Sequence, residues 1–177
     1  MTIAEFDHLG EDKKKDFLFQ CCGSSAWVDK MLPVFPVEDL VQLLDLAEEK
    51  WNECTKEEQR EAFDHHPKIG DINSLKKKFA NTAKWAAVEQ SGVNNSTQNI
   101  LTELATANAE YEKKFGFIFI VCATGRSAEA MLGDLNQRIK NNKAEEIEIA
   151  AGEQLKITKI RLEKLFEVND HEKMYEL

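Results

Sequence analysis

The sequence predicts an all-α fold, built as a single compact multi-helix domain over residues 1–177. All three prolines lie within the first 67 residues, which leaves room for long uninterrupted helices in the rest of the chain. Apolar residues recur at helical spacing in several segments. A chain of 177 residues is long enough to bury a core without disulfides or metals, and no repeat or linker divides it.

The first strongly periodic segment is residues 37–54, where leucines, an alanine and a tryptophan share one face and predict an amphipathic helix. Thr55 and Glu58 then form the pattern of a capping box, which opens a short second helix. This helix should end near His65, because the residue before a proline is pushed out of the helical region.

Four more helices are predicted in the part of the chain that follows the last proline. A helix over 82–91 is followed by a polar loop over 91–96. A longer helix runs from Thr97 to about Lys114 and is ended by Gly116, which suits a C-terminal cap. The last two run from a cap at Ser127 to about Asn141, and from about Ala144 to Glu167.

One segment departs from the helical pattern. Residues 117–122, Phe-Ile-Phe-Ile-Val-Cys, are β-branched and aromatic, a composition typical of a strand. No second run of this type is present for it to pair with. It is therefore either a buried start to the next helix or extended chain with unpaired backbone groups, and a bound polar ligand could satisfy such groups.

Charge and cysteine usage narrow the functional classes. The chain carries 23 Lys and Arg against 32 Asp and Glu, so nucleic acid and anionic membranes are poor partners. No apolar run is long enough for a membrane span, and the start lacks the pattern of a secretory signal.

The four cysteines form no C-x-x-C pair, which favours reduced, buried thiols in a cytoplasmic setting. The C-terminus is not Ser-Lys-Leu, so that peroxisomal address is missing.

Several enzyme classes lack support because their motifs are missing. The sequence has no G-x-G-x-x-G, no G-x-x-x-x-G-K-[ST] and no G-x-S-x-G. No histidine and cysteine spacing supplies a metal site, so no metal is expected.

His66 is the best candidate for chemistry. It lies where a helix is forced to end, beside Pro67, and histidine is the side chain whose charge changes near neutral pH. A capping or surface histidine is the alternative.

Two further candidates accompany it. Glu89 and Gln90 follow a small apolar helical turn, where a carboxylate can orient an imidazole or accept from a substrate N–H; a solvated pair is the alternative. Arg126 and Arg161 can bind carboxylates with two parallel hydrogen bonds, but arginines in an acidic protein are often ion-paired.

Taken together and in this order, these features resemble the OHCU decarboxylase family, whose members act on 2-oxo-4-hydroxy-4-carboxy-5-ureidoimidazoline at the end of urate breakdown. The resemblance runs from about Phe17 to Phe166. Its matching pieces are Cys21-Cys22-Gly23-Ser24, His66-Pro67 with Ile69-Gly70, Glu89-Gln90, residues 115–126, and residues 148–162.

The resemblance implies an all-helical homodimer that needs no cofactor and forms S-allantoin. It implies that His66 is the catalytic acid or base, with Glu89 beside it in the catalytic group. Some members carry a serine where this chain has Ala86, so contacts there can differ. The resemblance also implies that the substrate is held by Pro67, Ala86, Gln90, Phe119, Ile120, Val121, Cys122, Ala123 and Arg161.

Two other hypotheses stay open from the sequence. One is a lyase or isomerase that uses the same site on a related ureido compound. The other is a helical interaction module that has lost catalysis. The presence of His66, Glu89 and Arg161 favours an enzyme, because a scaffold would not require them.

Overall fold

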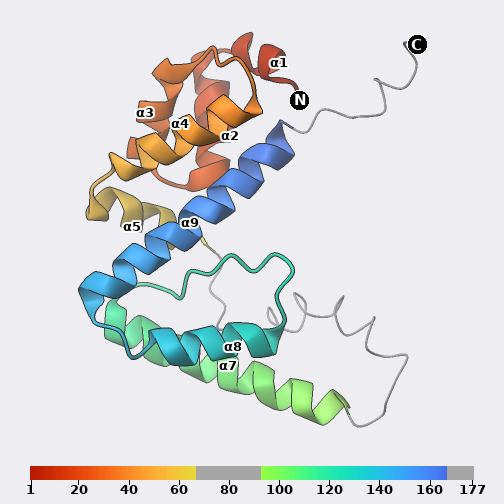
Figure 1. The fold of residues 1–177 in the computed structure, drawn as a ribbon, viewed down its shortest axis with the longest axis vertical. Helices are drawn as coiled ribbons and strands as arrows, with labels where there is room; N and C mark the ends of the chain where they lie inside the picture. The colour runs from red at the N-terminus through yellow and green to blue at the C-terminus, as the bar shows by residue number, and fades with distance from the viewer. Residues whose placement is uncertain (67–92, 167–177) are drawn as a thin grey trace. The chain divides into compact units, whose positions relative to one another are not determined.

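The computed structural model describes residues 1–66 and 93–166, and the side chains of the second range from residue 99 onward. Every regular element in these residues is a helix, which confirms the all-α class. The described residues form two compact units, 1–62 with 154–166, and 63–66 with 93–153. The elements, shown in Figure 1, are α1 (Ile3–Asp7), α2 (Glu11–Cys22), α3 (Ser25–Met31), the 3₁₀ helix η1 (Leu32–Val34), α4 (Leu40–Asn52), α5 (Lys56–Asp64), α7 (Val93–Phe115), α8 (Ala128–Arg138) and α9 (Lys143–Leu165).

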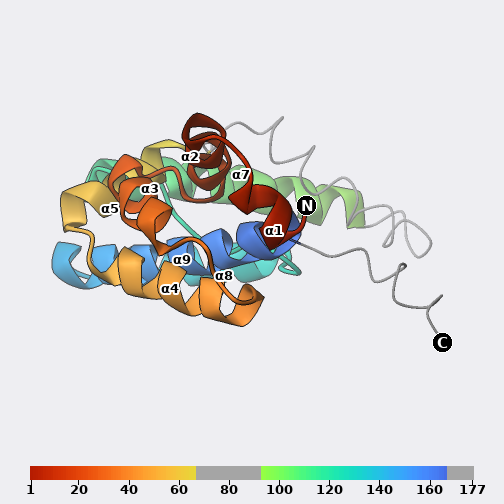
Figure 2. The ribbon, with the colours of Figure 1, turned by 90° about the horizontal axis from the view of Figure 1, so that it is seen from above.

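The first unit is built around two buried tryptophans. In this unit α3 packs on both α2 and α4 (Figure 2). Trp27 is fully buried, and its indole N–H donates to the carbonyl of Ala47 in α4 at 3.0 Å. Trp51 is also buried, and its carbonyl accepts from the Gln59 amide at 3.1 Å. These bonds satisfy polar groups inside an apolar core and fix how the helices pack.

The second unit is built around aromatic rings. Helices α7 and α8 pack against each other (Figure 1). Tyr111 of α7 is fully buried, and its ring centroid lies 4.6 Å from Phe115, 5.9 Å from Phe117 and 5.2 Å from Phe119. The contacts with Phe117 and Phe119 are edge-to-face, a geometry that adds to the stabilisation that burial provides. They also hold the chain that leaves α7 against the helix.

The structure confirms much of the predicted helix pattern. Helix α4 lies within the predicted 37–54. The capping box is formed: the Thr55 N–H donates to Glu58 Oε2 at 2.8 Å, and the Glu58 N–H donates to Thr55 Oγ1 at 3.3 Å. Gly116 ends α7 with a φ of 79°, and the Ser127 hydroxyl caps α8 by accepting from the Ala130 N–H. The predicted helix over 82–91 lies outside the described residues.

Two predicted boundaries are wrong. Helix α7 begins at Val93, so the expected loop over 91–96 fails from that residue onward. Short polar residues suit the first turn of a helix as well as a loop, so composition alone cannot separate the two. Helix α8 ends at Arg138 and does not reach Asn141, because the N–H groups of Lys140 and Asn141 bond three residues back and tighten the chain into a turn.

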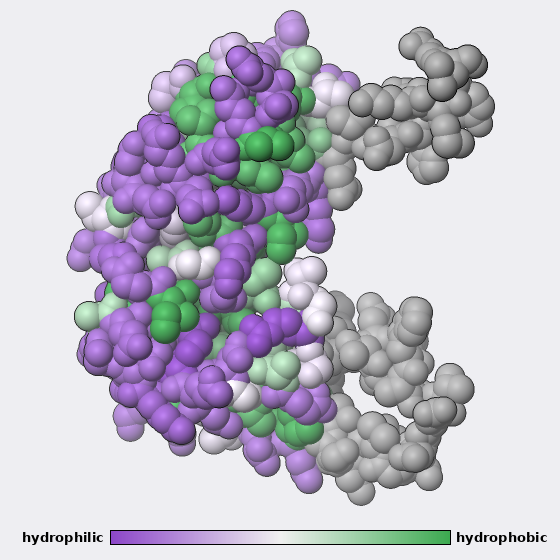
Figure 3. Space-filling model, in the orientation of Figure 1, coloured by the Kyte–Doolittle hydropathy of each residue, from purple (hydrophilic) through white to green (hydrophobic). Residues whose placement is uncertain are grey.

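The surface in Figure 3 is largely hydrophilic, as expected for a chain with 31% charged residues. Val41 is 68% exposed, an isolated large apolar side chain of the described surface. Within the described helices, none is both long enough and apolar enough to cross a membrane.

Candidate active site

His66 lies just beyond the C-terminal end of α5. Its backbone N–H donates to the carbonyl of Phe63 at 3.2 Å, a bond three residues back that closes the helix end. The His66 residue is half-buried, whereas His65 beside it is exposed. The predicted position of His66 at a helix end is therefore confirmed, and the two histidines have different environments.

Phe63 links this helix end to the segment that follows α7. It is fully buried, and its ring centroid lies 5.3 Å from that of Phe117. The backbone of His66 is bonded to Phe63, and Phe117 leads directly into residues 118–123. These contacts connect the end of α5, next to His66, to the start of this segment.

Residues 118–123 belong to no helix and no strand. Helix α8 starts only at Ala128, so the alternative of a buried helix start is wrong. Phe119, Ile120 and Val121 are nevertheless buried, with 3%, 2% and 6% of their surface exposed. Buried chain without regular structure must find other partners for its backbone groups.

Only some of those groups have partners among the described residues. The Ile120 carbonyl accepts from Arg138 Nη1 at 2.9 Å, and the Cys122 N–H donates to Glu153 Oε2 at 2.7 Å. Among the described residues, the N–H groups of Phe119, Val121 and Ala123 donate to no protein acceptor, and the Val121 carbonyl accepts no protein bond. Within the part of the chain that the structure describes, no residue competes for this row of hydrogen-bonding groups, which suits a polar ligand.

The segment rests on a buried ion pair. Arg138 at the end of α8 is 8% exposed, and Glu146 in the first turn of α9 is fully buried. Arg138 Nε and Nη2 lie 2.8 Å and 2.7 Å from Glu146 Oε1. Asn141 Nδ2 donates to the other carboxylate oxygen at 2.8 Å, and the Tyr111 hydroxyl also donates to Glu146. Burial, together with this bond to Glu146, raises the pKa of Tyr111 far above its usual value.

Both predicted arginines have protein partners in the structure. Arg126 Nη2 lies 2.5 Å from Asp134 Oδ2, eight residues along the chain. Arg161 lies in the first unit, where its Nη1 donates to the carbonyls of Gln20 and Cys21 at 3.3 Å and 3.2 Å. These carbonyls belong to the last turn of α2, where carbonyl groups lack partners within the helix. A role for Arg161 toward substrate remains a prediction.

The cysteines fit the structural role predicted for them. All four are free, and three are buried. Burial raises the pKa of the Cys22 thiol to about 12 and that of the Cys21 thiol to about 11. Burial likewise raises the pKa of Cys54 to about 11. Thiols with such values stay protonated at neutral pH and are weak nucleophiles. The described residues contain no cluster of three or more potential metal ligands.

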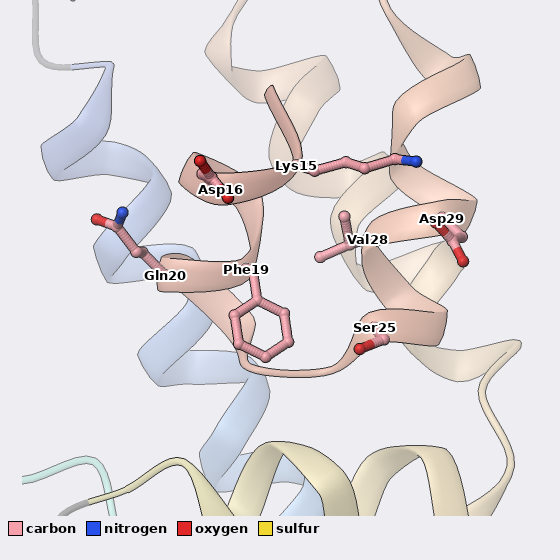
Figure 4. Close-up of a pocket in the computed structure, with 7 residues that line it drawn as sticks. All are labelled: Lys15, Asp16, Phe19, Gln20, Ser25, Val28 and Asp29. Carbon is pink, nitrogen blue, oxygen red and sulfur yellow. The ribbon is translucent and has the colours of Figure 1, made fainter. Parts of the chain in front are cut away.

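A pocket of about 380 Å³ lies elsewhere, between α2 and α3. Phe19 and Val28 point into it from the two helices, and Lys15, Asp16 and Asp29 surround it (Figure 4). None of the site residues predicted from the sequence lines it. The site near His66 is therefore the better candidate for chemistry.

Comparison with known proteins decides the family. The family model described as OHCU decarboxylase matches residues 7–163. The chain belongs to the OHCU decarboxylase family. The resemblance inferred from the sequence is thereby confirmed.

Solved structures support the fold of this OHCU decarboxylase family member. The chain is 38% identical to an OHCU decarboxylase crystallised in the presence of (S)-allantoin, with a TM-score of 0.67, covering 85% of this chain and 97% of that one. An (S)-allantoin synthase is 18% identical, with a TM-score of 0.70, covering 96% of this chain and 56% of that one. At that identity, the second likeness shows the fold alone.

The curated relatives include longer proteins. A uric acid degradation bifunctional protein of Arabidopsis thaliana is 39% identical over 89% of this chain, which spans 48% of the plant protein. Another, from Bacillus sp. (strain TB-90), is 25% identical over 98% of this chain, which spans 32% of it. The family member thus spans about half or less of these relatives.

Part of the predicted site lies outside the described residues, namely Pro67, Ala86, Glu89 and Gln90. Among the described residues, His66 and the segment 119–123 belong to the second unit, while Arg161 belongs to the first unit.

Three residues beside the segment were not singled out from the sequence: Arg138, Glu146 and Glu153. Arg138 and Glu146 face the interior, but they stand in sequence among many solvated charges. Nothing local in the sequence marks such a buried pair. The one usable signal was the apolar segment itself, whose unpaired backbone had to find polar partners.

Proposed function

We propose that this chain catalyses the cofactor-free decarboxylation of 2-oxo-4-hydroxy-4-carboxy-5-ureidoimidazoline to S-allantoin in urate degradation. The observation that carries the proposal is a helix-end histidine bonded to Phe63, whose ring contacts Phe117 at the start of a buried segment. Several backbone donors of this segment have no acceptor among the described residues, and the chain is a member of the OHCU decarboxylase family. The named relatives act in uric acid degradation or bear the name of this decarboxylase.

The chemistry of this substrate explains why no cofactor is needed. Breaking the bond between the ring carbon and its carboxylate releases CO2 and leaves an electron pair on that carbon. The neighbouring C=N bond of the ring accepts the pair, so the substrate provides its own electron sink. Protonation of the ring nitrogen that accepted the pair, loss of the hydroxyl proton and delivery of a proton to the neighbouring carbon then give allantoin. The protein has to orient the substrate and move protons.

His66 is proposed to act as the general acid or base. It can take the hydroxyl proton or deliver a proton to the neighbouring carbon. Delivery to one face of the ring gives S-allantoin in place of a racemate. Glu89 is proposed to act beside it.

The backbone of residues 119–123 is proposed to hold the polar edge of the substrate. The N–H groups of Phe119, Val121 and Ala123, which have no acceptor among the described residues, are donors for carbonyl or carboxylate oxygens, where charge changes during the reaction. The remaining proposed contacts with the substrate come from Pro67, Ala86, Gln90 and Arg161. Backbone groups of Ile120 and Cys122 are also proposed to contact it. We propose that the protein is a homodimer and acts in the cytoplasm. Light scattering of the purified chain tests the oligomeric state.

Release of CO2 tests the reaction. Substrate is generated fresh, and the rate of CO2 release is compared with and without the chain, before and after exhaustive treatment with EDTA. We expect faster release in both protein samples, because the substrate supplies the electron sink. Release at the uncatalysed rate would contradict the proposed function, and loss with EDTA that zinc restores would contradict its cofactor-free character.

A further inference from the structure

The buried segment is held at two consecutive peptide groups, one on each side of Val121. Arg138 Nη1 donates to the Ile120 carbonyl at 2.9 Å, and Glu153 Oε2 accepts from the Cys122 N–H at 2.7 Å. Both side chains come from helices, α8 and α9, so they are fixed by regular structure. The segment itself has no such support.

Because peptide groups are planar, these two bonds also fix the directions of the Val121 N–H and carbonyl. Both peptide bonds are trans, and in a trans peptide the carbonyl and the following N–H point in opposite directions. The Val121 N–H therefore points away from Arg138, and the Val121 carbonyl points away from Glu153. These two Val121 groups have no protein partner among the described residues.

Arg138 is itself held rigidly for this task. Its guanidinium is paired with the fully buried Glu146 and lies over the Phe119 ring, 4.6 Å from the ring centroid. A buried ion pair is a weak source of stability, since apolar residues of similar volume often serve as well. The planar, forked guanidinium of Arg138 is instead suited to holding one carbonyl in one direction.

We propose that Arg138 and Glu153 are positioning residues that preset the backbone donors and acceptors of residues 119–123 for substrate. This inference rests on the proposed function for the identity of the substrate, whereas the positioning itself can be measured without it. Misplacing groups that should meet the transition state lowers turnover more than it weakens binding.

Glu153 provides the cleaner test, because replacing Arg138 would leave Glu146 buried without its cation and could unfold the chain. Glu153→Met removes the acceptor and keeps the bulk, while Glu153→Gln keeps an oxygen that can accept from the Cys122 N–H. Tyr111→Phe is the control: it removes a buried hydroxyl that donates to Glu146 and that bonds neither to Glu153 nor to the backbone of the segment.

Hydrogen exchange of the full chain without substrate measures the positioning. We expect Glu153→Met to speed amide exchange in residues 117–126 by about tenfold, with Glu153→Gln and Tyr111→Phe close to wild type. Unchanged exchange in Glu153→Met would overturn the proposal, whatever the substrate.

Steady-state kinetics measure the consequence. We expect kcat of Glu153→Met to fall about 10–100-fold with KM within about threefold of wild type, and Glu153→Gln to recover most of the loss. Equal losses in the Met and Gln variants, or a loss matched by Tyr111→Phe, would overturn the positioning role. An inactive wild type would refute the proposed function and leave the exchange result standing.

Discussion

At the scale of single residues, the environments of His65 and His66 differ although the residues are adjacent. His66 is half-buried at the end of α5, bonded to Phe63 beside the buried segment, while His65 is exposed. This difference gives each histidine substitution a distinct expected effect.

His66→Ala or His66→Asn should lower turnover about 10²–10⁴-fold, the usual range for removing a general acid or base. Folding should be intact, because the side chain lies at a helix end and is only half-buried. Steady-state kinetics and thermal melting check both parts. His65→Ala is the control and should do far less; equal losses in the two variants would mean that the wrong imidazole was chosen or that the effect is structural.

Arg161→Lys should weaken substrate binding although the charge is kept, because a lysine cannot make a planar contact with two parallel hydrogen bonds. We expect a loss of about 1.5–3 kcal/mol, or roughly 10–150-fold in kcat/KM. The melting temperature should be measured as well, because Arg161 also donates to carbonyls at the end of α2.

Arg126→Lys is the control for that experiment, because Arg126 is paired locally with Asp134. Near-wild-type kinetics for Arg161→Lys beside a crippled Arg126→Lys would transfer the anion-binding role to Arg126. A lowered melting temperature for Arg161→Lys with unchanged kcat/KM would leave it as a cap of α2 alone.

At the scale of elements, one glycine ends a helix and another lies inside one. Gly23 ends α2 with a φ of 82°, and its N–H donates to the Phe19 carbonyl at 2.7 Å. Gly133 lies inside α8, is exposed, and has open space where a Cβ would stand.

The same substitution should therefore have opposite effects at the two sites. Gly23→Ala should destabilise the fold by about 1–2 kcal/mol, the cost of a left-handed conformation for an L-residue. Gly133→Ala should stabilise it by roughly 0.5–1 kcal/mol through lower chain entropy. Urea unfolding of both variants checks this, and a change of the same sign in both would contradict the cap geometry.

How well the sequence predicts an element depends on how local its signal is. The capping box of Thr55 and Glu58, the cap at Ser127 and the stop at Gly116 are local, and all three are found. Helices α1 to α3 were not predicted, because they are short or lack a wide apolar stripe and depend on tertiary packing. Phe6 of α1, for example, packs on Phe35 and Phe166.

The site divides in the same way. The helix end at His66 follows from the proline after it, and the unusual segment follows from its apolar composition. The partners of that segment, Arg138 and Glu153, come from distant helices and depend on tertiary packing. No spacing rule along the chain identifies them. The single-domain organisation over 1–177 likewise stays a prediction.

At the scale of the whole molecule, buried thiols couple stability to pH. Burial raises the pKa of Cys22 from 9.0 to about 12. Between these values the unfolded chain loses its proton and the folded chain keeps it, so stability falls as pH rises above about 9.

Cys22→Ala should therefore reduce the loss of stability between pH 8 and pH 9.5 by about 1 kcal/mol. Urea unfolding under reducing conditions at both pH values measures this difference, whatever the variant's stability at pH 8. A decline as steep as that of the wild type would show that this thiol is not protected from ionisation in the folded chain.

The central claim is stereospecific decarboxylation by this protein, and circular dichroism tests it most directly. Fresh urate is converted by urate oxidase and hydroxyisourate hydrolase, and the chain is then added while the signal of optically active allantoin is followed. We expect S-allantoin to accumulate in proportion to the protein added and faster than in its absence. Racemic allantoin formed at the rate of the protein-free mixture would contradict the account.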